Sequence, residues 1–148
     1  MKNNKGFTLI ELLAVIVILA IIALITTPIV LNIINQSKEA ANRRSVEAYA
    51  KAVEYAVMEY EYDHNGELPA NFAAIKDNVS YSNSDVVCNV AINCDNKGEV
   101  ILTECKVGSY TNNLYKYDSK AGSKGAQVDD DGEAPSTSTG VSCPTTQP

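Results

Sequence analysis

The stretch Gly6-Phe7-Thr8-Leu9-Ile10-Glu11 opens an apolar run that continues past Pro28 to Asn32 and decides the fold of this chain. Between Glu11 and Lys38 the sequence contains no Asp, Glu, Lys or Arg. A helix needs roughly 20 apolar residues to cross the hydrocarbon core of a bilayer. The run is longer than that, so it predicts a helix that spans a membrane or lies in the core of an oligomer.

The residues around Gly6 carry a second signal. The basic leader, the order Gly6-Phe7-Thr8-Leu9-Ile10-Glu11 and the apolar run with its proline strongly resemble the processing site of type IV pilins and of the related pseudopilins. The resemblance implies that residues 1–6 are a leader peptide, which prepilin peptidase removes by cleaving between Gly6 and Phe7. It also implies that the enzyme then N-methylates Phe7. An ordinary secretory signal peptide is the alternative, but the run is too long and lacks a clean Ala-x-Ala site.

Glu11 is the fifth residue after the expected cleavage and lies in the first turn of the helix, where the helix dipole favours a carboxylate. In a bilayer or a filament core this carboxylate needs a cationic partner. The resemblance implies that the partner is the α-amino group of Phe7 in a neighbouring subunit, which makes Glu11 an assembly residue. The alternative is an interfacial Glu that reaches the lipid headgroups.

Pro28 lies within residues 7–35, which we expect to form the hydrophobic transmembrane or filament-core part of the helix. Proline has no N–H for a helical hydrogen bond, so the sequence predicts a helix kink or local melting at this position. In filaments of similar pilins this part of the helix loses hydrogen bonds, which lets subunits pack. The alternative is a tolerated transmembrane proline.

Residues 36–65 form the amphipathic half of the same helix, which we expect to run from Phe7 to about Tyr62 and to stop at Asn65-Gly66. If continuous, it is on the order of 80 Å long. Apolar residues with helical spacing mark one face, which should hold a small sheet, and charged residues mark the other. The apolar face contains Val46, Tyr49, Ala50, Val53, Ala56, Val57 and Tyr60, and the charged face contains Glu47, Lys51, Glu54 and Glu61.

Residues 66–118 predict an antiparallel sheet of three or four strands. A connector, Leu68–Ser84, with a short helix at Asn71–Lys76 precedes the strands. Residues 119–148 are rich in Gly, Ser, Thr, Pro and Asp, and we expect a polar loop or tail. The predicted fold class is therefore α+β, with a long N-terminal helix packed against a small antiparallel sheet, as in type IV pilins. The expected strands are Val86–Ile92, Glu99–Val107 and Leu114–Tyr117.

All four cysteines, Cys88, Cys94, Cys105 and Cys143, lie in the polar half of the chain. A chain delivered across a membrane reaches an oxidising compartment, so one or two disulfides are expected. The sequence leaves all three complete pairings open. A zinc site is the alternative, but the Cys-x2-4-Cys spacing typical of zinc ligands is missing.

Other chemistry is weakly represented. Asp129 and Asp131, in the stretch Asp129–Glu133, are calcium candidates, but their spacing departs from Asp-x-Asp-x-Asp-Gly and favours a solvated acidic turn. The net charge of −6 argues against direct nucleic-acid binding. No Gly-x-Ser-x-Gly elbow or phosphate-binding Gly-rich loop occurs, so we expect no enzyme, no resident metal and no cofactor.

The resemblance implies a function. The expected protein is a structural subunit of a type IV pilus, assembled by helix bundling into a surface filament for adhesion, twitching motility or DNA uptake. Its expected partners are copies of itself, prepilin peptidase and a membrane assembly platform driven by a cytoplasmic ATPase. Before assembly it should cross the cytoplasmic membrane once, with its N-terminus inside. The alternatives are a pseudopilin of a type II secretion or competence apparatus and a membrane-tethered binding module.

Overall fold

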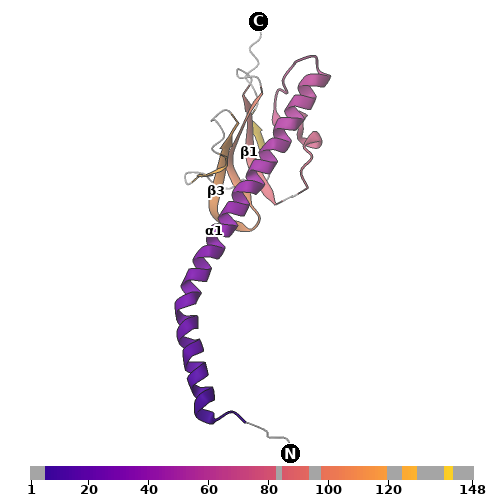
Figure 1. The fold of residues 1–148 in the computed structure, drawn as a ribbon. Coiled ribbons are helices and arrows are strands. Elements are labelled where there is room, and N and C mark those ends of the chain that lie inside the picture. Colours follow the sequence, from indigo (N-terminus) through magenta and orange to yellow (C-terminus); the bar gives the residue numbers. More distant parts are fainter. Residues whose placement is uncertain (1–5, 83–84, 94–97, 120–124, 130–138, 142–148) are drawn as a thin grey trace, which may run out of the picture. The chain divides into compact units, whose positions relative to one another are not determined.

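A computed structural model describes residues 6–82, 85–93, 98–119, 125–129 and 139–141 of the chain. The chain forms two compact units, Met1–Glu39 and Ala40–Pro148. One long helix followed by a small sheet confirms the predicted α+β fold class. In order along the chain the elements are α1 (Leu9–Asp63), the single 3-10 turns η1 (Phe72–Ala74) and η2 (Lys76–Asn78), and the strands β1 (Val86–Asn93), β2 (Glu99–Val107), β3 (Tyr110–Asp118), β4 (Gln127–Asp129) and β5 (Thr139–Val141) (Figure 1).

The helix α1 ends where the sequence predicts. Its last residue is Asp63, and the N–H of Gly66 donates to the carbonyl of Glu61 over 2.8 Å. Asn65 has a φ of 55°, in the left-handed region that asparagine tolerates better than most residues. A left-handed residue followed by this hydrogen bond is a common way to end a helix. The Asn65-Gly66 stop signal is therefore confirmed.

The second half of α1 supplies one side of the core of the second unit. Six of the seven residues of the predicted apolar stripe are buried, and the seventh, Tyr60, packs against them. In Figure 1 this part of α1 lies across one face of the sheet. The strands contribute apolar side chains from that same face. The largest fully buried residues of this core include Tyr115, Ile75, Leu102, Val46 and Val53.

The sheet has the strand order β4-β3-β2-β1-β5. Neighbouring strands from β4 to β1 are antiparallel, as predicted, and β5 joins the β1 edge in parallel. Strand β1 alternates strictly between buried and half-buried residues, which is the pattern of a strand with one face on a core. The predicted short helix at Asn71–Lys76 is present as the single turn η1, and the side chain of its N-cap residue Asn71 accepts the Ala74 N–H over 3.1 Å.

A β-bulge in β2 aims a cysteine into the core. Cys88 of β1 is the one residue between two ladder pairs, and Glu104 and Cys105 are the two residues opposite it on β2. Glu104 has a φ of 54° and absorbs the extra residue. The next core-facing residue after Leu102 is therefore Cys105, not Glu104. Without the bulge the strict two-residue period would point Cys105 away from the core.

The bulge brings Cys88 and Cys105 together as a disulfide, with both residues fully buried. Of the three complete pairings that the sequence left open, this bond excludes the two that pair Cys88 or Cys105 with another cysteine. A cysteine in a disulfide has no thiolate to offer a metal, so a zinc site that uses Cys88 or Cys105 is excluded. Cys94 and Cys143 lie outside the described residues.

Part of the C-terminal stretch departs from the prediction. Residues 119–148 were expected to form a loop or tail, but 127–129 and 139–141 form the two edge strands β4 and β5. Strand β4 pairs with Leu114–Lys116 of β3, and β5 pairs with Asn89–Ala91 of β1. Ala126 is fully buried. The loop prediction, which was made from composition, is wrong for these residues. Strands as short as β4 and β5 are held by backbone hydrogen bonds, and every residue type except proline can donate and accept these bonds.

Glu47 and Glu54, which the sequence analysis placed on the charged face of α1, instead accept hydrogen bonds from the sheet unit. Oε1 of Glu47 accepts a hydrogen bond from the Ala126 N–H over 2.9 Å. Two helical turns further along α1, Oε1 of Glu54 accepts a hydrogen bond from the Tyr117 hydroxyl over 3.0 Å. Both bonds connect α1 to residues more than sixty positions away in sequence. They fasten β3 and the segment before β4 to the helix.

A substitution at Gly125 tests whether the Glu47 hydrogen bond stabilises the segment before β4. Its φ is +68°, and a Cβ added there would collide with the Glu47 carboxylate. Gly108 has a similar φ of +63°, but a Cβ there would meet nothing within 4 Å. We expect Gly108→Ala to cost about 1–2 kcal/mol of unfolding free energy from backbone strain alone. Gly125→Ala should cost about 1–3 kcal/mol more, because it also displaces Glu47 from the Ala126 N–H.

Urea unfolding of the detergent-solubilised, oxidised chain measures both losses. The matched pair separates the two causes, because the left-handed backbone is common to both glycines. Equal losses for the two variants would contradict a structural role for the contact between Glu47 and the Gly125 segment.

Candidate functional site

The expected cleavage bond lies just outside the helix. Gly6, Phe7 and Thr8 precede α1 and have no regular secondary structure, and the Phe7 side chain is 83% exposed. A peptide bond within α1 would have to leave its helical hydrogen bonds before a peptidase could bind it in an extended form. The bond between Gly6 and Phe7 requires no such unfolding. Residues 1–5 of the expected leader lie outside the described residues.

Thr8 begins the helix, a role that the sequence analysis missed. Its Oγ1 accepts the backbone N–H of Glu11 over 3.3 Å, and its carbonyl accepts the N–H of Leu12 over 3.2 Å. A hydroxyl that accepts an N–H of the first helical turn defines an N-cap. The order Thr8-Leu9-Ile10-Glu11 matches the Ser/Thr-x-x-Glu capping pattern, so the signal was present in the sequence. The cap fixes where the helix starts, three residues before Glu11.

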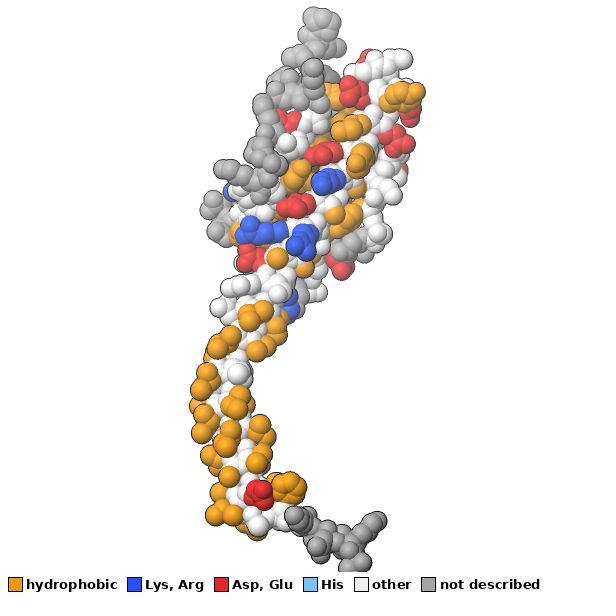
Figure 2. All heavy atoms as spheres, viewed as in Figure 1, with side chains coloured by type: hydrophobic (Ala, Val, Ile, Leu, Met, Phe, Trp, Pro, Cys, Tyr) orange, Lys and Arg blue, Asp and Glu red, His pale blue; other side chains and the backbone are white. Residues whose placement is uncertain are grey.

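Glu11 is exposed among apolar side chains. Nineteen large apolar residues between Phe7 and Ile34 are 42 to 84% exposed, and the most hydropathic 18-residue window of α1 is 0% buried, with a mean hydropathy of 3.1. Figure 2 shows hydrophobic side chains along this part of the helix. Within the described residues the Glu11 carboxylate makes no hydrogen bond or ion pair. By length and composition this segment is able to cross a membrane.

Pro28 lies inside α1, and the helix continues through it without a break. The helix kink or local melting predicted at Pro28 stays a prediction. Two hydroxyls lie just before the proline. The Thr27 hydroxyl donates to the Ala23 carbonyl over 2.7 Å, and the Thr26 hydroxyl donates to the same oxygen over 3.4 Å. Such bonds satisfy polar side chains within an apolar helix.

The predicted calcium candidates receive no support from the described residues. Asp129 is the last residue of β4, where its backbone pairs with Leu114, and Asp131 lies outside the described residues. Where the chain is described, no group of three or more His, Cys, Asp or Glu side chains is placed to hold a metal ion.

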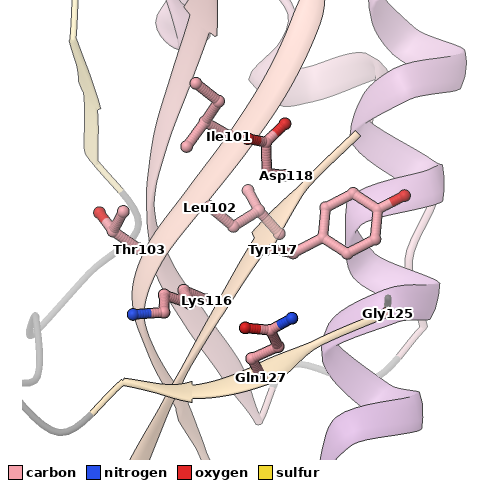
Figure 3. A pocket seen from close by; sticks show the side chains of 8 residues that line it. All are labelled: Ile101, Leu102, Thr103, Lys116, Tyr117, Asp118, Gly125 and Gln127. Atoms are coloured by element: carbon pink, nitrogen blue, oxygen red, sulfur yellow. The ribbon is translucent and has the colours of Figure 1, made fainter. Parts of the chain in front are cut away.

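One pocket of about 280 Å³ opens beside the sheet in the second unit. In Figure 3 the Tyr117 ring points toward α1, and Gly125 lies near the same helix. The charged side chains at its wall are Lys116 and Asp118, and it contains no His, Ser or Cys. The full lining is Ile101, Leu102, Thr103, Lys116, Tyr117, Asp118, Gly125 and Gln127.

Tyr117 is the one tyrosine of the pocket and has an altered acidity. Burial, followed by the charge of Glu54 and the hydrogen bond to it, raises the pKa of Tyr117 to about 12. Glu47 and Asp118 add smaller contributions in the same direction. Each of these effects disfavours the phenolate, because a second negative charge would stand beside a carboxylate in partly desolvated surroundings.

This pKa predicts a pH dependence of stability. Because the folded pKa lies above the unfolded value of about 10, the contribution of Tyr117 is fully present below pH 10 and is lost as the pH rises toward about 12. We expect Tyr117→Phe to reduce this alkaline loss, measured as the unfolding free energy in urea at several pH values. Tyr55→Phe is the matched control, since Tyr55 is 71% exposed, and should keep the wild-type slope. An unchanged slope in Tyr117→Phe would contradict the assignment.

Comparison with known proteins supports the N-terminal signal. A family model described as the prokaryotic N-terminal methylation motif matches residues 1–27, which include the expected cleavage bond and Glu11. No solved structure matches the chain.

Three relatives illustrate the likeness. The chain is 33% identical over 86 residues to the competence protein ComGC of Bacillus subtilis, which covers 58% of this chain and 82% of the relative. It is 34% identical over 67 residues to the ComG operon protein 3 homolog of Bacillus licheniformis, covering 45% and 65%. It is also 43% identical over 76 residues to the type IV wide pilus major component PilA4 of Thermus thermophilus, covering 51% and 53%. The chain thus spans about four fifths of the Bacillus subtilis protein, two thirds of the Bacillus licheniformis protein and half of the Thermus thermophilus protein.

Proposed function

This chain belongs to the family of prepilin-type proteins, and from that premise we propose that it is a structural subunit of a surface filament of the type IV pilus class. In this proposal prepilin peptidase cleaves between Gly6 and Phe7 and methylates the new N-terminus. The apolar helices of many copies then bundle, and the sheet units coat the bundle.

The observation that carries the proposal is the exposed apolar surface between Phe7 and Ile34. Burying a large apolar side chain contributes about 1.5–3 kcal/mol, so exposure of nineteen such residues to water would cost on the order of tens of kcal/mol. Lipid removes this cost before assembly, and neighbouring helices remove it in a filament. Because both environments are apolar, transfer from one to the other conserves the burial and leaves the direction of assembly to helix–helix packing and to the machine that drives it.

In this proposal Glu11 determines how the helices align when they move from lipid into the filament. Cleavage after Gly6 creates an α-amino group on Phe7, four residues before Glu11, and in both positions the charge stands at the start of an apolar helix. An unpaired charge in apolar surroundings is costly, whereas a carboxylate next to an ammonium group is much less so. Pairing of Glu11 in one copy with the amine of another would therefore favour one axial register.

The proposal places the subunit in two locations. Before assembly it spans the cytoplasmic membrane once with its N-terminus inside, where the peptidase acts. A membrane platform and a cytoplasmic ATPase then extract it into the filament, and the second unit faces the outside. The buried Cys88–Cys105 disulfide agrees with an oxidising environment for that unit.

A competence pseudopilin is the second candidate. It is favoured by the names of the Bacillus relatives and by the 82% coverage of the Bacillus subtilis competence protein, compared with 53% of the Thermus pilus component. The N-terminal geometry fits both candidates equally, because both use a cleaved leader and a bundling apolar helix. They differ in whether a filament extends from the cell surface.

Mass spectrometry of gently sheared cells tests the proposal. We expect the sheared fraction to contain an abundant peptide that begins at Phe7 and carries one added methyl group. If the same peptide were found only in membranes, the result would contradict a surface filament and favour the competence pseudopilin. An intact Met1 start in membranes would contradict both and leave a tethered binding module.

Glu11→Gln tests the pairing. The variant should be cleaved and methylated as in wild type, but we expect its yield in sheared filaments to fall by roughly ten-fold or more, because the incoming amine loses its charged partner. Glu67→Gln, at an exposed site beyond the end of α1, is the control and should assemble normally. A wild-type yield for Glu11→Gln, or a variant that retains Met1, would contradict the assembly role.

A further inference from the structure

The face of α1 that points away from the core in the second unit has a regular composition. Its exposed residues follow each other at alternating spacings of three and four, the spacing of a heptad seam. We name this row the outer seam; it consists of Ala41, Arg44, Ala48, Lys51, Tyr55, Met58 and Tyr62. Of these seven residues, the sequence analysis assigned only Lys51, to the charged face of the helix.

The C-terminal part of the outer seam exposes large apolar side chains. Tyr55, Met58 and Tyr62 are 71%, 58% and 87% exposed. They are the large hydrophobic residues of the described second unit that remain this open to solvent. Tyrosine, methionine and arginine are the residue types enriched at protein interfaces, and a contiguous row of them on one helix face indicates a contact surface.

Charge divides the outer seam into two halves. Arg44 and Lys51 are the exposed cations of its first half, while the exposed carboxylates Glu59 and Asp63 flank the tyrosines of its second half. Figure 2 shows basic, acidic and hydrophobic side chains together on the visible face of this unit. Glu59 is eight positions after Lys51, too distant for an ion pair within one helix, where partners lie three or four positions apart.

We propose that the outer seam binds the outer seam of a second copy of this chain that is displaced along the helix axis. In this contact the cationic half of one copy meets the acidic, aromatic half of the next. The inference rests on the proposed function, because copies that enter from one membrane must lie parallel. Parallel copies without displacement would put Lys51 against Lys51 and Glu59 against Glu59, which is repulsive.

The sequence positions set the displacement. The separation of Lys51 from Glu59 corresponds to roughly 12 Å along a helix, and that of Arg44 from Glu59 to roughly 22 Å. A shift of roughly 17 to 21 Å, which lies within this range, also brings the rings of Tyr55 and Tyr62 over the first half of the neighbouring seam. There, Ala41 and Ala48 leave room for a ring, and Arg44 and Lys51 offer cations to its face. Charge pairing, ring packing and small side chains therefore all favour a displaced contact over one without displacement.

Charge reversal in cells that assemble wild-type filaments tests the contact. We expect Lys51→Glu to lower the yield of sheared filaments by roughly ten-fold or more, because acidic residues then face each other across the seam. Lys51→Glu combined with Glu59→Lys should restore the yield, since the exchanged charges are again complementary. Lys76→Glu makes the same charge change at an exposed position of η2 and should have no effect.

A photo-reactive benzoylphenylalanine at position 62 identifies the partner directly. The expected cross-link joins this position to a peptide that contains residues 44–51 of a second copy, since these residues lie too far along the same helix to be reached within one chain. Lys51→Glu filaments at wild-type yield, a double variant no better than Lys51→Glu, or a cross-link to another protein would overturn the inference. Absence of wild-type filaments would instead contradict the proposed function, so the two failures are distinguishable.

Discussion

The structure depends on one constraint: the apolar surface of residues 7–34 has nothing within the described chain to cover it. Nineteen large apolar side chains remain open there, and Glu11 is the only charged residue among them. Water is too costly a surrounding for this surface, so the chain is stable only in lipid or beside other apolar helices. In the proposed function, assembly would exchange one apolar environment for another, and Glu11 and the outer seam would decide which neighbour is accepted.

The second unit solves a different problem with the same helix. From Val46 onward one face of α1 packs against the sheet, and the side chains between them form a small hydrophobic core. The Cys88–Cys105 disulfide and the bulge at Glu104 lock the centre of the sheet, while Glu47 and Glu54 attach its far strands to the helix. The opposite face of α1 is left as the outer seam. One helix therefore serves the membrane, the core and the proposed contact between copies.

Much of this arrangement could be predicted from local pattern. The core stripe from Val46 to Tyr60 and the stop at Asn65-Gly66 follow from helical period and backbone preference. The roles of Glu47 and Glu54 could not be predicted, because their partners Ala126 and Tyr117 lie 79 and 63 positions away. The disulfide pairing depends on a one-residue change of register, and the strands β4 and β5 depend on backbone bonds. Neither leaves a periodic trace in the sequence.

The most direct test of the central claim is a helical reconstruction of sheared filaments by electron cryomicroscopy. The account predicts that residues 7–34 of neighbouring copies pack against each other at the filament axis, with Glu11 of one copy at the amine of Phe7 of another. Apolar helices that face solvent on the outside of the filament, or sheet units at its axis, would contradict it.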